Sequence, residues 1–278
     1  MARAGRAERA VSGQRAFEPA LFRSPISLPE ARSGRFTVRH VTIGGEQPVI
    51  GMRQAILRGR RPVFVELTQP LLVHELTEGD RGVWMSDRPE ELNQIAEMLH
   101  DVRPRGRVLV GGLGLGCLAA ALVQRRGTRE VTVVEREPDV VRLCRAPGYR
   151  AVVAPIEDYL REHAVPFDFY LLDTWADTGE GTWWDEVMPL RRTIRNRFGK
   201  KPKIHCWAED IMLGQVRRAA IGMSGRHWNY RALPTVADAA MIERFVRDVG
   251  LPSWETEFGS SVDAVLGETE VARKERAS

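Results

Sequence analysis

The sequence has few cysteines, no long hydrophobic run and no metal-binding pattern. Its three cysteines (Cys117, Cys144 and Cys206) are widely spaced in apolar surroundings, which argues against a disulfide framework and predicts reduced, buried thiols. No apolar stretch approaches the roughly 18 residues of a membrane-spanning helix. The six histidines form no pair with metal-ligand spacing, so we expect no metal site. Together these absences predict a cytoplasmic protein without a membrane segment.

The sequence also lacks a strong excess of charge outside its N-terminus. The net charge is +4, and residues 1–15 contribute +3 of it through four arginines and one glutamate. Residues 1–15 lack the continuous apolar stretch that a secretory signal peptide contains. We therefore interpret residues 1–33 as a flexible basic leader, with a transit peptide as the alternative. The nearly balanced remainder does not indicate a nucleic-acid-binding domain.

One local basic strip stands apart from this balance. Residues 191–203 contain seven Lys and Arg residues and no acid. The pattern is typical of a solvated helix face followed by a turn. A strip that contacts phosphates, on a nucleic acid or a small molecule, is the alternative interpretation.

The first third of the chain has the pattern of a small β-rich module. Residues 36–43 and 62–67 are short, β-branched and partly alternating, and Gly-Gly and Gly-Arg-Arg-Pro turn signals separate them. We therefore predict an antiparallel module over residues 34–86. Residues 87–100 then read as a helix, with Ser86 and Asp87 available as caps and Pro89 in the first turn.

From Arg107 onward, apolar strands alternate with helices. The predicted strands cover residues 108–110, 131–134, 151–154, 169–172 and 203–207, and the predicted helices cover 117–124, 139–144, 157–162, 185–198, a segment from about 209, and 236–249. Continuous apolar strands alternating with helices indicate a mostly parallel α/β sheet with helices on both faces. We assign residues 87–265 to this Rossmann-like domain and residues 266–278 to a tail.

A glycine-rich turn follows the first of these strands. Gly112-Leu113-Gly114-Leu115-Gly116 joins strand to helix, where a backbone without Cβ atoms can approach a ligand closely. Residues 114–119 also fit the G-x-G-x-x-A dinucleotide fingerprint. A tight turn without a ligand is the structural alternative.

Two acids follow later strands. Glu135 ends the second strand, 19 residues after Gly116, where a carboxylate can accept both hydroxyls of a ribose. Glu137 is better placed as a dipole partner at the next helix N-terminus. Asp173 ends the fourth strand, at the sheet edge where ligands of α/β proteins bind, and a capping role is its alternative. The glycine turn and Glu135 indicate a nucleoside without deciding between NAD and S-adenosylmethionine.

In order and spacing, these segments resemble the class I S-adenosylmethionine-dependent methyltransferase superfamily, and within it the spermidine synthase-like branch. The resemblance covers about residues 84–207 and rests on residues 108–116, 131–141 and 167–173, with Val110 where many methyltransferases have an acid. It implies that S-adenosylmethionine is bound by Gly112, Leu113, Gly114, Gly116, Glu135, Arg136, Ile156 and Glu157. It also implies a catalytic role for Asp173.

The resemblance has clear departures. Leu115 stands where aminopropyltransferases have an Asp, Asn93-Gln94 replaces their Tyr-His pair, and the second acid after strand four is out of register at Asp177. True spermidine synthesis is therefore not expected. Pro155 replaces the usual acid after strand three, which would leave adenine recognition to the region of Ile156 and Glu157.

The expected function is methyl transfer from S-adenosylmethionine to an undetermined small-molecule or nucleic-acid acceptor. Trp175 and Trp184 flank the loop after Asp173, where they could stack on a planar substrate or simply pack under the loop. The alternatives are an aminopropyltransferase-like enzyme, an NAD-dependent oxidoreductase and a non-catalytic nucleoside-binding scaffold. The oligomeric state stays open, with a homodimer as one arrangement.

Overall fold

The computed structural model describes residues 15–17, 23–45, 48–51, 61–67, 69–175, 182–209 and 211–212. The predicted helix at 236–249 and the predicted tail at 266–278 lie outside the described residues. At 209 and 211–212 the backbone is helical, in agreement with the helix expected from about residue 209.

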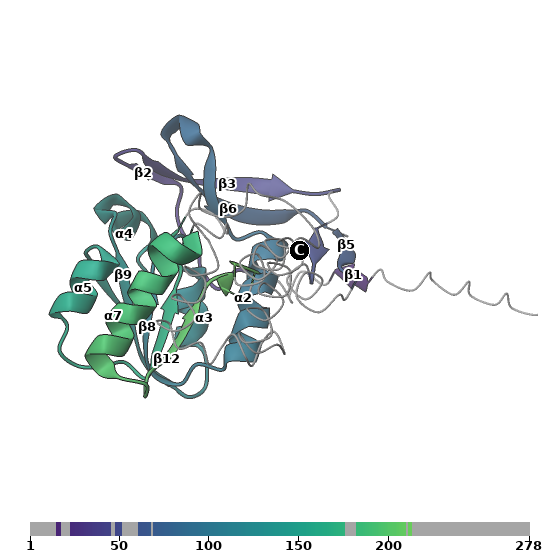
Figure 1. Ribbon diagram of the computed structural model, residues 1–278. Helices are drawn as coiled ribbons and strands as arrows, with labels where there is room; N and C mark the ends of the chain where they lie inside the picture. Colours follow the sequence, from purple (N-terminus) through teal and green to yellow (C-terminus); the bar gives the residue numbers. More distant parts are fainter. Residues whose placement is uncertain are drawn as a thin grey trace, which may run out of the picture. The chain divides into compact units, whose positions relative to one another are not determined.

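A five-stranded sheet with flanking helices is the main element of the structure (Figure 1). Its strands lie in the order β10-β9-β8-β11-β12, and β10 pairs with β9, and β11 with β12, in parallel. The strands are β8 (Gly106–Gly111), β9 (Thr128–Glu135), β10 (Arg150–Val153), β11 (Phe169–Leu172) and β12 (Lys203–Cys206). From β8 the chain first adds β9 and β10 on one side and then β11 and β12 on the other. This reversal creates a switch point at the carboxyl end of β8. The predicted Rossmann-like α/β sheet is confirmed.

The helices follow the strands as predicted. They are α2 (Pro89–Val102), α3 (Cys117–Val123), α4 (Pro138–Cys144), α5 (Ile156–Glu162) and α7 (Met188–Phe198), and a π-helical turn, η3 (Trp183–Val187), leads into α7. Gly199, with φ +70°, ends α7 as expected of a glycine after a helix.

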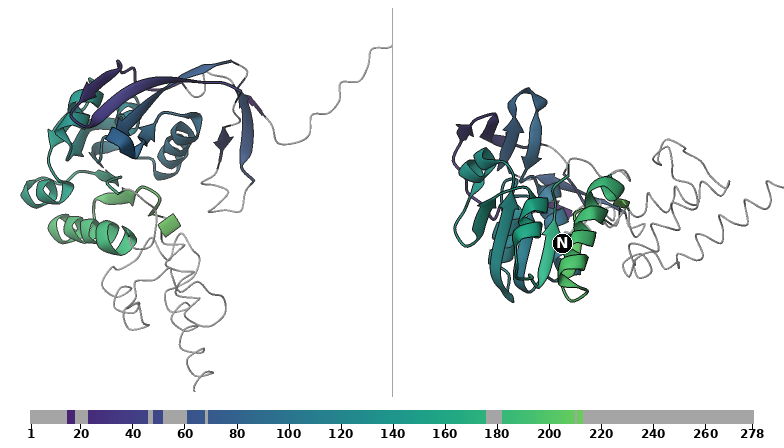
Figure 2. Two further views of the ribbon diagram at one scale, coloured as in Figure 1. Left: turned by 90° about the horizontal axis from the view of Figure 1, so that it is seen from above. Right: turned by 60° about the vertical axis from the view of Figure 1, so that its left-hand side comes forward.

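The chain divides into two compact units, and the first comprises residues 1–108 and 112–154. It contains an antiparallel sheet of order β2-β3-β6-β7, with strands β2 (Ala31–Ser33), β3 (Phe36–Ile43), β6 (Leu71–Glu78) and β7 (Val83–Ser86), and the short helix η2 (Gly79–Arg81). The long strands β3 and β6 run side by side over their whole length (Figure 2). The predicted strand at 36–43 coincides with β3, and the predicted β-rich N-terminal module is confirmed.

A second, smaller sheet has the order β1-β5-β4, from β1 (Arg15–Phe17), β5 (Val63–Leu67) and β4 (Val49–Ile50). β1 and β2 both precede residue 34, inside the segment that the sequence predicts as a flexible leader. β2 is ordered by its pairing with β3 and by Ser33, which is buried. The predicted division between residues 86 and 87 stays a prediction.

The β-rich part of the first unit packs on α4 through a small polar cluster. Ser33 Oγ donates to Asp139 Oδ1 at 2.6 Å, and Arg142 Nη1 donates to both Ser33 Oγ (2.6 Å) and Asp139 Oδ1 (2.8 Å). Gly34, with φ +54°, lies directly against the Asp139 carboxylate. The sheet therefore contacts the helix that follows Glu135.

The start of α2 differs from the expectation in one respect. Arg88, rather than Ser86 or Asp87, is the N-cap residue, and it makes no side-chain cap hydrogen bond, although Pro89 opens the helix as predicted. The buried Asp87 carboxylate instead accepts hydrogen bonds from the His74 backbone N–H (2.5 Å) and from His74 Nδ1 (2.7 Å). A buried carboxylate needs such partners, and His74 supplies two.

The second unit comprises residues 109–111 and 155–278. All four residues of β11 are buried, as predicted for a strand covered on both faces, and Trp183 in η3 is fully buried. Helices α5 and α7 pack side by side (Figures 1 and 2).

Part of the basic strip 191–203 makes hydrogen bonds within this unit. Arg191 is buried and pairs with Glu209 Oε1 at 2.6 Å. Arg195 Nη1 donates to the carbonyl oxygens of Gly199, Lys200 and Pro202 at 3.3, 3.0 and 2.7 Å. The strip is therefore only partly a solvated face, because Arg191 binds Glu209 and Arg195 holds the turn after α7.

Cys117, Cys144 and Cys206 are free and buried, as predicted. Burial raises the pKa of the Cys144 thiol to about 12 and also raises the pKa of the other two thiols. Within the described part of the chain, no helix combines the length and apolar character that crossing a membrane requires.

Gly34 offers a test of the contact between the β-rich part and α4. A Cβ at Gly34 would overlap Asp139 Oδ2, whereas one at Gly45, also at positive φ (+73°), would meet nothing within 4 Å. Both Gly→Ala substitutions force an alanine into left-handed backbone, at about 1 kcal/mol, and Gly34→Ala adds about 1–2 kcal/mol by displacing the Asp139 carboxylate. We expect urea denaturation to show the larger loss of unfolding free energy for Gly34→Ala. Equal losses would contradict the contact.

Candidate functional site

The glycine turn after β8 depends on left-handed backbone at three positions. Gly112, Gly114 and Gly116 have φ of +89°, +50° and +85°, a region that side chains with a Cβ rarely adopt. The Gly112 N–H donates to Val134 O at 2.9 Å, and the Gly116 N–H donates to Leu113 O at 2.8 Å, which closes the turn. The sequence placed this turn correctly, between β8 and α3.

Gly116 also leaves little room for a side chain. A Cβ at Gly116 would lie 3.1 Å from Tyr149 Oη and 3.2 Å from the Cys144 carbonyl oxygen. The Tyr149 hydroxyl is fixed there because it donates to Cys144 O (3.1 Å) and accepts from the Ala146 N–H (2.9 Å). The turn is therefore packed tightly on its α4 side.

Met85, at the end of β7, packs against the turn from the β-rich part. Its sulfur accepts the Leu115 N–H at 3.3 Å, and a Cβ at Gly114 would overlap this sulfur. Sequence reasoning missed this residue, because nothing in the pattern of residues 83–86 indicates that β7 ends beside the glycines.

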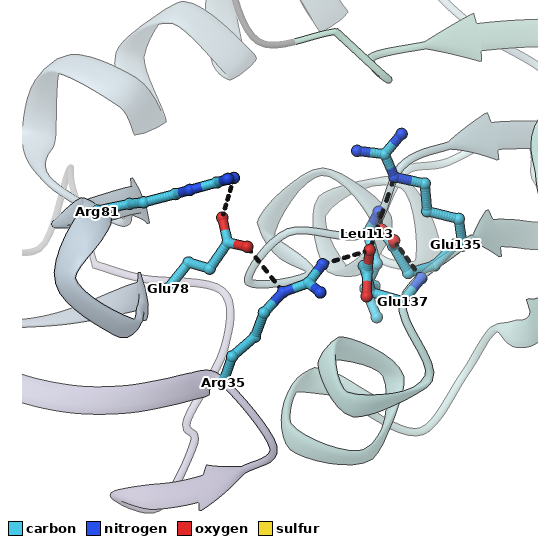
Figure 3. A network of polar contacts seen from close by, with 7 residues as sticks. Arg35, Glu78, Arg81, Leu113, Glu135 and Glu137 are labelled. Carbon is cyan, nitrogen blue, oxygen red and sulfur yellow. Dashed lines mark hydrogen bonds and ion pairs between the residues drawn. The ribbon is translucent and has the colours of Figure 1, made fainter.

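Glu135 is the residue that joins the turn to β9. It is the last residue of this strand, and its carboxylate Oε2 accepts the Leu113 N–H at 2.8 Å while Oε1 accepts the Glu137 N–H at 2.9 Å (Figure 3). Each carboxylate oxygen has two lone pairs, so both can accept a further hydrogen bond from a ligand hydroxyl. The structure thus brings together two of the predicted cofactor residues, Leu113 and Glu135, and gives the carboxylate a fixed orientation.

The two residues after Glu135 differ in their surroundings. The Arg136 side chain is 64% exposed, and its Nε lies 3.9 Å from Glu137 Oε1. Glu137 is the N-cap of α4, as expected from its place at a helix start, but it makes no side-chain cap hydrogen bond. Its carboxylate accepts from Arg35 Nη2 at 2.7 Å instead, a partner that sequence reasoning did not foresee (Figure 3).

An unassigned acid, Glu91, lies in the first turn of α2. Burial raises the pKa of its carboxyl to about 7, against the opposing effect of hydrogen bonds from Ser86. The negative charges of Asp87 and Glu91 also contribute to the raised pKa of Cys117, the first residue of α3. These carboxyl groups therefore lie close to the start of the helix that follows the glycine turn.

In the second unit, the end of β11 is held against Gly111. The Asp173 backbone N–H donates to Gly111 O at 2.8 Å, and the side chain is partly exposed. A Cβ at Gly111 would lie 3.1 Å from Leu172, 3.3 Å from Thr174 and 3.5 Å from Ile156. A side chain at Gly111 would thus crowd its neighbours, and the Gly-Gly doublet at 111–112 was the signal for this position.

The remaining predicted residues fall in different surroundings. Ile156 is buried at the first position of α5, whereas Glu157, the next residue, is exposed. Trp175 is half-buried, and its Nε1 is buried without a hydrogen-bond partner within the described ranges. Trp184 lies in η3, and its side chain is outside the described residues. In the described part of the chain, no group of three His, Cys, Asp or Glu side chains is placed to hold a metal ion.

No protein-family model matches the sequence, and no curated relative matches it. Among solved structures, the spermidine synthase from Thermotoga maritima is 15% identical, over 45% of this chain and 50% of that one, with a TM-score of 0.32. A TehB-like SAM-dependent methyltransferase from Corynebacterium glutamicum is 19% identical over 41% and 60% of the two chains, with a TM-score of 0.29. Human methyltransferase-like protein 13, in complex with SAH, is 15% identical over 57% and 86%, with a TM-score of 0.30.

The similarity covers only part of such proteins. The chain spans 50% of the spermidine synthase and 48% of the N-terminal domain of EvdMO1, which was solved with SAH bound. The fold follows from the strand order of this chain.

The raised pKa of Glu91 predicts a pH-dependent stability. The pKa of this carboxyl is about 7 in the folded protein and ordinarily 4.5, so the stabilising contribution of its proton is present below pH 4.5 and is lost as the pH rises through 7. Glu91→Gln keeps the shape and removes the titration. We expect its unfolding free energy, relative to the unmodified protein, to rise by about 2 kcal/mol at pH 8 and to change little at pH 4.5. Urea denaturation at the two pH values measures this, and an equal change at both would contradict it.

Proposed function

We propose that this protein is an S-adenosylmethionine-dependent methyltransferase. The observation that carries the proposal is the Glu135 carboxylate, held by the Leu113 N–H of a glycine turn at the switch point of a five-stranded α/β sheet. S-adenosylmethionine would supply a methyl group bonded to a positively charged sulfur. Several solved structures of similar fold are described as SAM-dependent methyltransferases or as complexes with SAH, in keeping with this proposal.

Different residues of the chain would bind the ribose, the methionine part and the adenine of this ligand. Glu135, with both oxygens already oriented by backbone N–H groups, would accept the two ribose hydroxyls, with Arg136 beside it. The glycine turn at residues 112–116 would lie along the methionine part, where the absence of Cβ atoms permits close approach. Ile156 would give the adenine an apolar contact, and Glu157 would lie at its edge.

Asp173 is the residue we propose for the transfer step. In methyl transfer the acceptor atom would use a lone pair to bond the methyl carbon, and the carbon–sulfur bond would break with its electron pair staying on sulfur. The Asp173 carboxylate would orient the acceptor and take the proton that it loses. Holding acceptor and methyl donor in line supplies much of the rate enhancement. Trp175 and Trp184 would contact an acceptor that is a small molecule or a nucleic acid.

Aminopropyl transfer is the less suitable alternative. Leu115 stands at the position of the aspartate that aminopropyltransferases carry in their glycine turn, and its side chain is fully buried. It therefore offers no polar group to an aminopropyl amine. An NAD-dependent oxidoreductase would share the turn and Glu135. Ligand binding must therefore distinguish it from a methyltransferase.

The cofactor assignment is tested by binding of S-adenosylhomocysteine and NADH. We expect isothermal calorimetry to show binding of S-adenosylhomocysteine and none of NADH. Glu135→Ala should weaken the affinity for S-adenosylhomocysteine about 10- to 100-fold through loss of charged hydrogen bonds. Glu130→Ala is the matched control, because Glu130 lies on the same strand and pairs only with the partly exposed Arg107 among the ion pairs of the described residues. Binding of NADH, or equal affinities of Glu135→Ala and the unmodified protein, would refute the assignment.

The role of Asp173 is tested by transfer of a labelled methyl group. Small-molecule and nucleic-acid acceptors would be screened with S-[methyl-³H]adenosylmethionine. With an acceptor in hand, Asp173→Asn should lower kcat about 100-fold or more, because the amide cannot take the acceptor's proton. Its affinity for S-adenosylhomocysteine should stay within about twofold, since backbone contacts hold β11. Binding without transfer to any acceptor class would favour the scaffold alternative.

A further inference from the structure

We propose that Arg35 is a positioning residue for the ribose-binding carboxylate of Glu135 and that it acts through Glu137. The β-rich part of the chain would then contribute directly to nucleoside binding, beyond its packing on α4. This inference rests on the proposed function, because it assigns Glu135 to a ribose.

Arg35 lies between two carboxylates that come from different elements. Its Nε donates to Glu78 Oε1, at the end of β6, and its Nη2 donates to Glu137 Oε1, each at 2.7 Å (Figure 3). The Arg35 side chain is 55% exposed, whereas those of Glu78 and Glu137 are only 13% and 20% exposed. The planar guanidinium presents several donors in fixed directions, so it binds the two acids through separate nitrogens, whereas a lysine has a single nitrogen.

Glu137 connects this arginine to Glu135. Its backbone N–H donates to Glu135 Oε1 at 2.9 Å, while its side chain binds Arg35 instead of capping α4. Glu137 therefore donates a hydrogen bond to Glu135 and also carries a second negative charge, two residues further along the chain. Arg35 both neutralises that charge and fixes the side chain that bears it.

Without Arg35, Glu137 would have no comparable partner. The other cation beside it in the described part of the chain is Arg136, whose Nε is 3.9 Å away on a largely exposed side chain. The Glu137 carboxylate would then turn to the N–H groups at the start of α4, or its unpaired charge would repel the carboxylate of Glu135. Either change disturbs the Glu137 N–H that orients Glu135. Loss of an exposed ion pair has little effect on global stability, so the consequence should be local.

The experiment measures the Kd of S-adenosylhomocysteine by calorimetry, with circular dichroism to verify folding. Arg35→Ala should raise the Kd about fivefold, and Arg35→Lys should raise it less, because the charge is retained without the fork. Two matched controls should stay within about twofold. Arg81→Ala removes another partner of Glu78, since the 83% exposed Arg81 side chain also pairs with that acid. Arg142→Ala loosens the contact of Ser33 with α4.

A double variant separates positioning from packing. In Arg35→Ala/Glu137→Gln the unpaired charge beside Glu135 is gone while the backbone N–H of residue 137 remains, so the Kd should return to within about twofold of the unmodified protein. Recovery supports the inference. An unchanged Kd in Arg35→Ala, a double variant as weak as Arg35→Ala, or equal losses in the two controls would overturn it. Failure of the unmodified protein to bind S-adenosylhomocysteine would instead refute the proposed function and this inference with it.

Discussion

The candidate site depends on a carboxylate whose two oxygens each accept a hydrogen bond from a backbone N–H group. Glu135 receives one hydrogen bond from Leu113 in the glycine turn and one from Glu137 at the start of α4. The turn gains from this bond, because its glycines are the residues with the greatest backbone freedom. The carboxylate therefore orders the turn while the turn orients the carboxylate. Because these bonds are charge-assisted, they are stronger than neutral ones.

The tight packing around the turn has the same effect. Tyr149 and the Cys144 carbonyl close one side near Gly116, and the Met85 sulfur lies against Gly114 on another. In such surroundings the backbone is fixed before any ligand arrives, so binding does not have to order the loop. Preorganisation of this kind improves affinity by lowering the entropic cost of binding.

The five strands of the parallel sheet could be predicted from the sequence because their physical signal is local. β8, β9 and β11 are buried runs of apolar residues, and such runs are readable without knowledge of their neighbours. β6 is harder to read, because its buried residues include His74, Glu75 and Thr77. Their partners, Asp87 and Arg88 among them, are distant in sequence, so the polar residues look like surface positions. The glycine turn and the position of Glu135 were likewise predictable, whereas Met85 and Arg35 reach the turn only through tertiary structure.

Two arginines of α7 limit what the formal charge of the chain can mean. Arg195 directs one nitrogen at three carbonyl oxygens, and Arg191 is buried against Glu209. A guanidinium that already donates to its own backbone keeps its positive charge but has fewer N–H groups to offer a phosphate. Counting Lys and Arg residues therefore overstates the number of polyanion contacts this segment can form. The salt dependence of any nucleic-acid affinity would be correspondingly shallow, since each released counterion requires a phosphate contact.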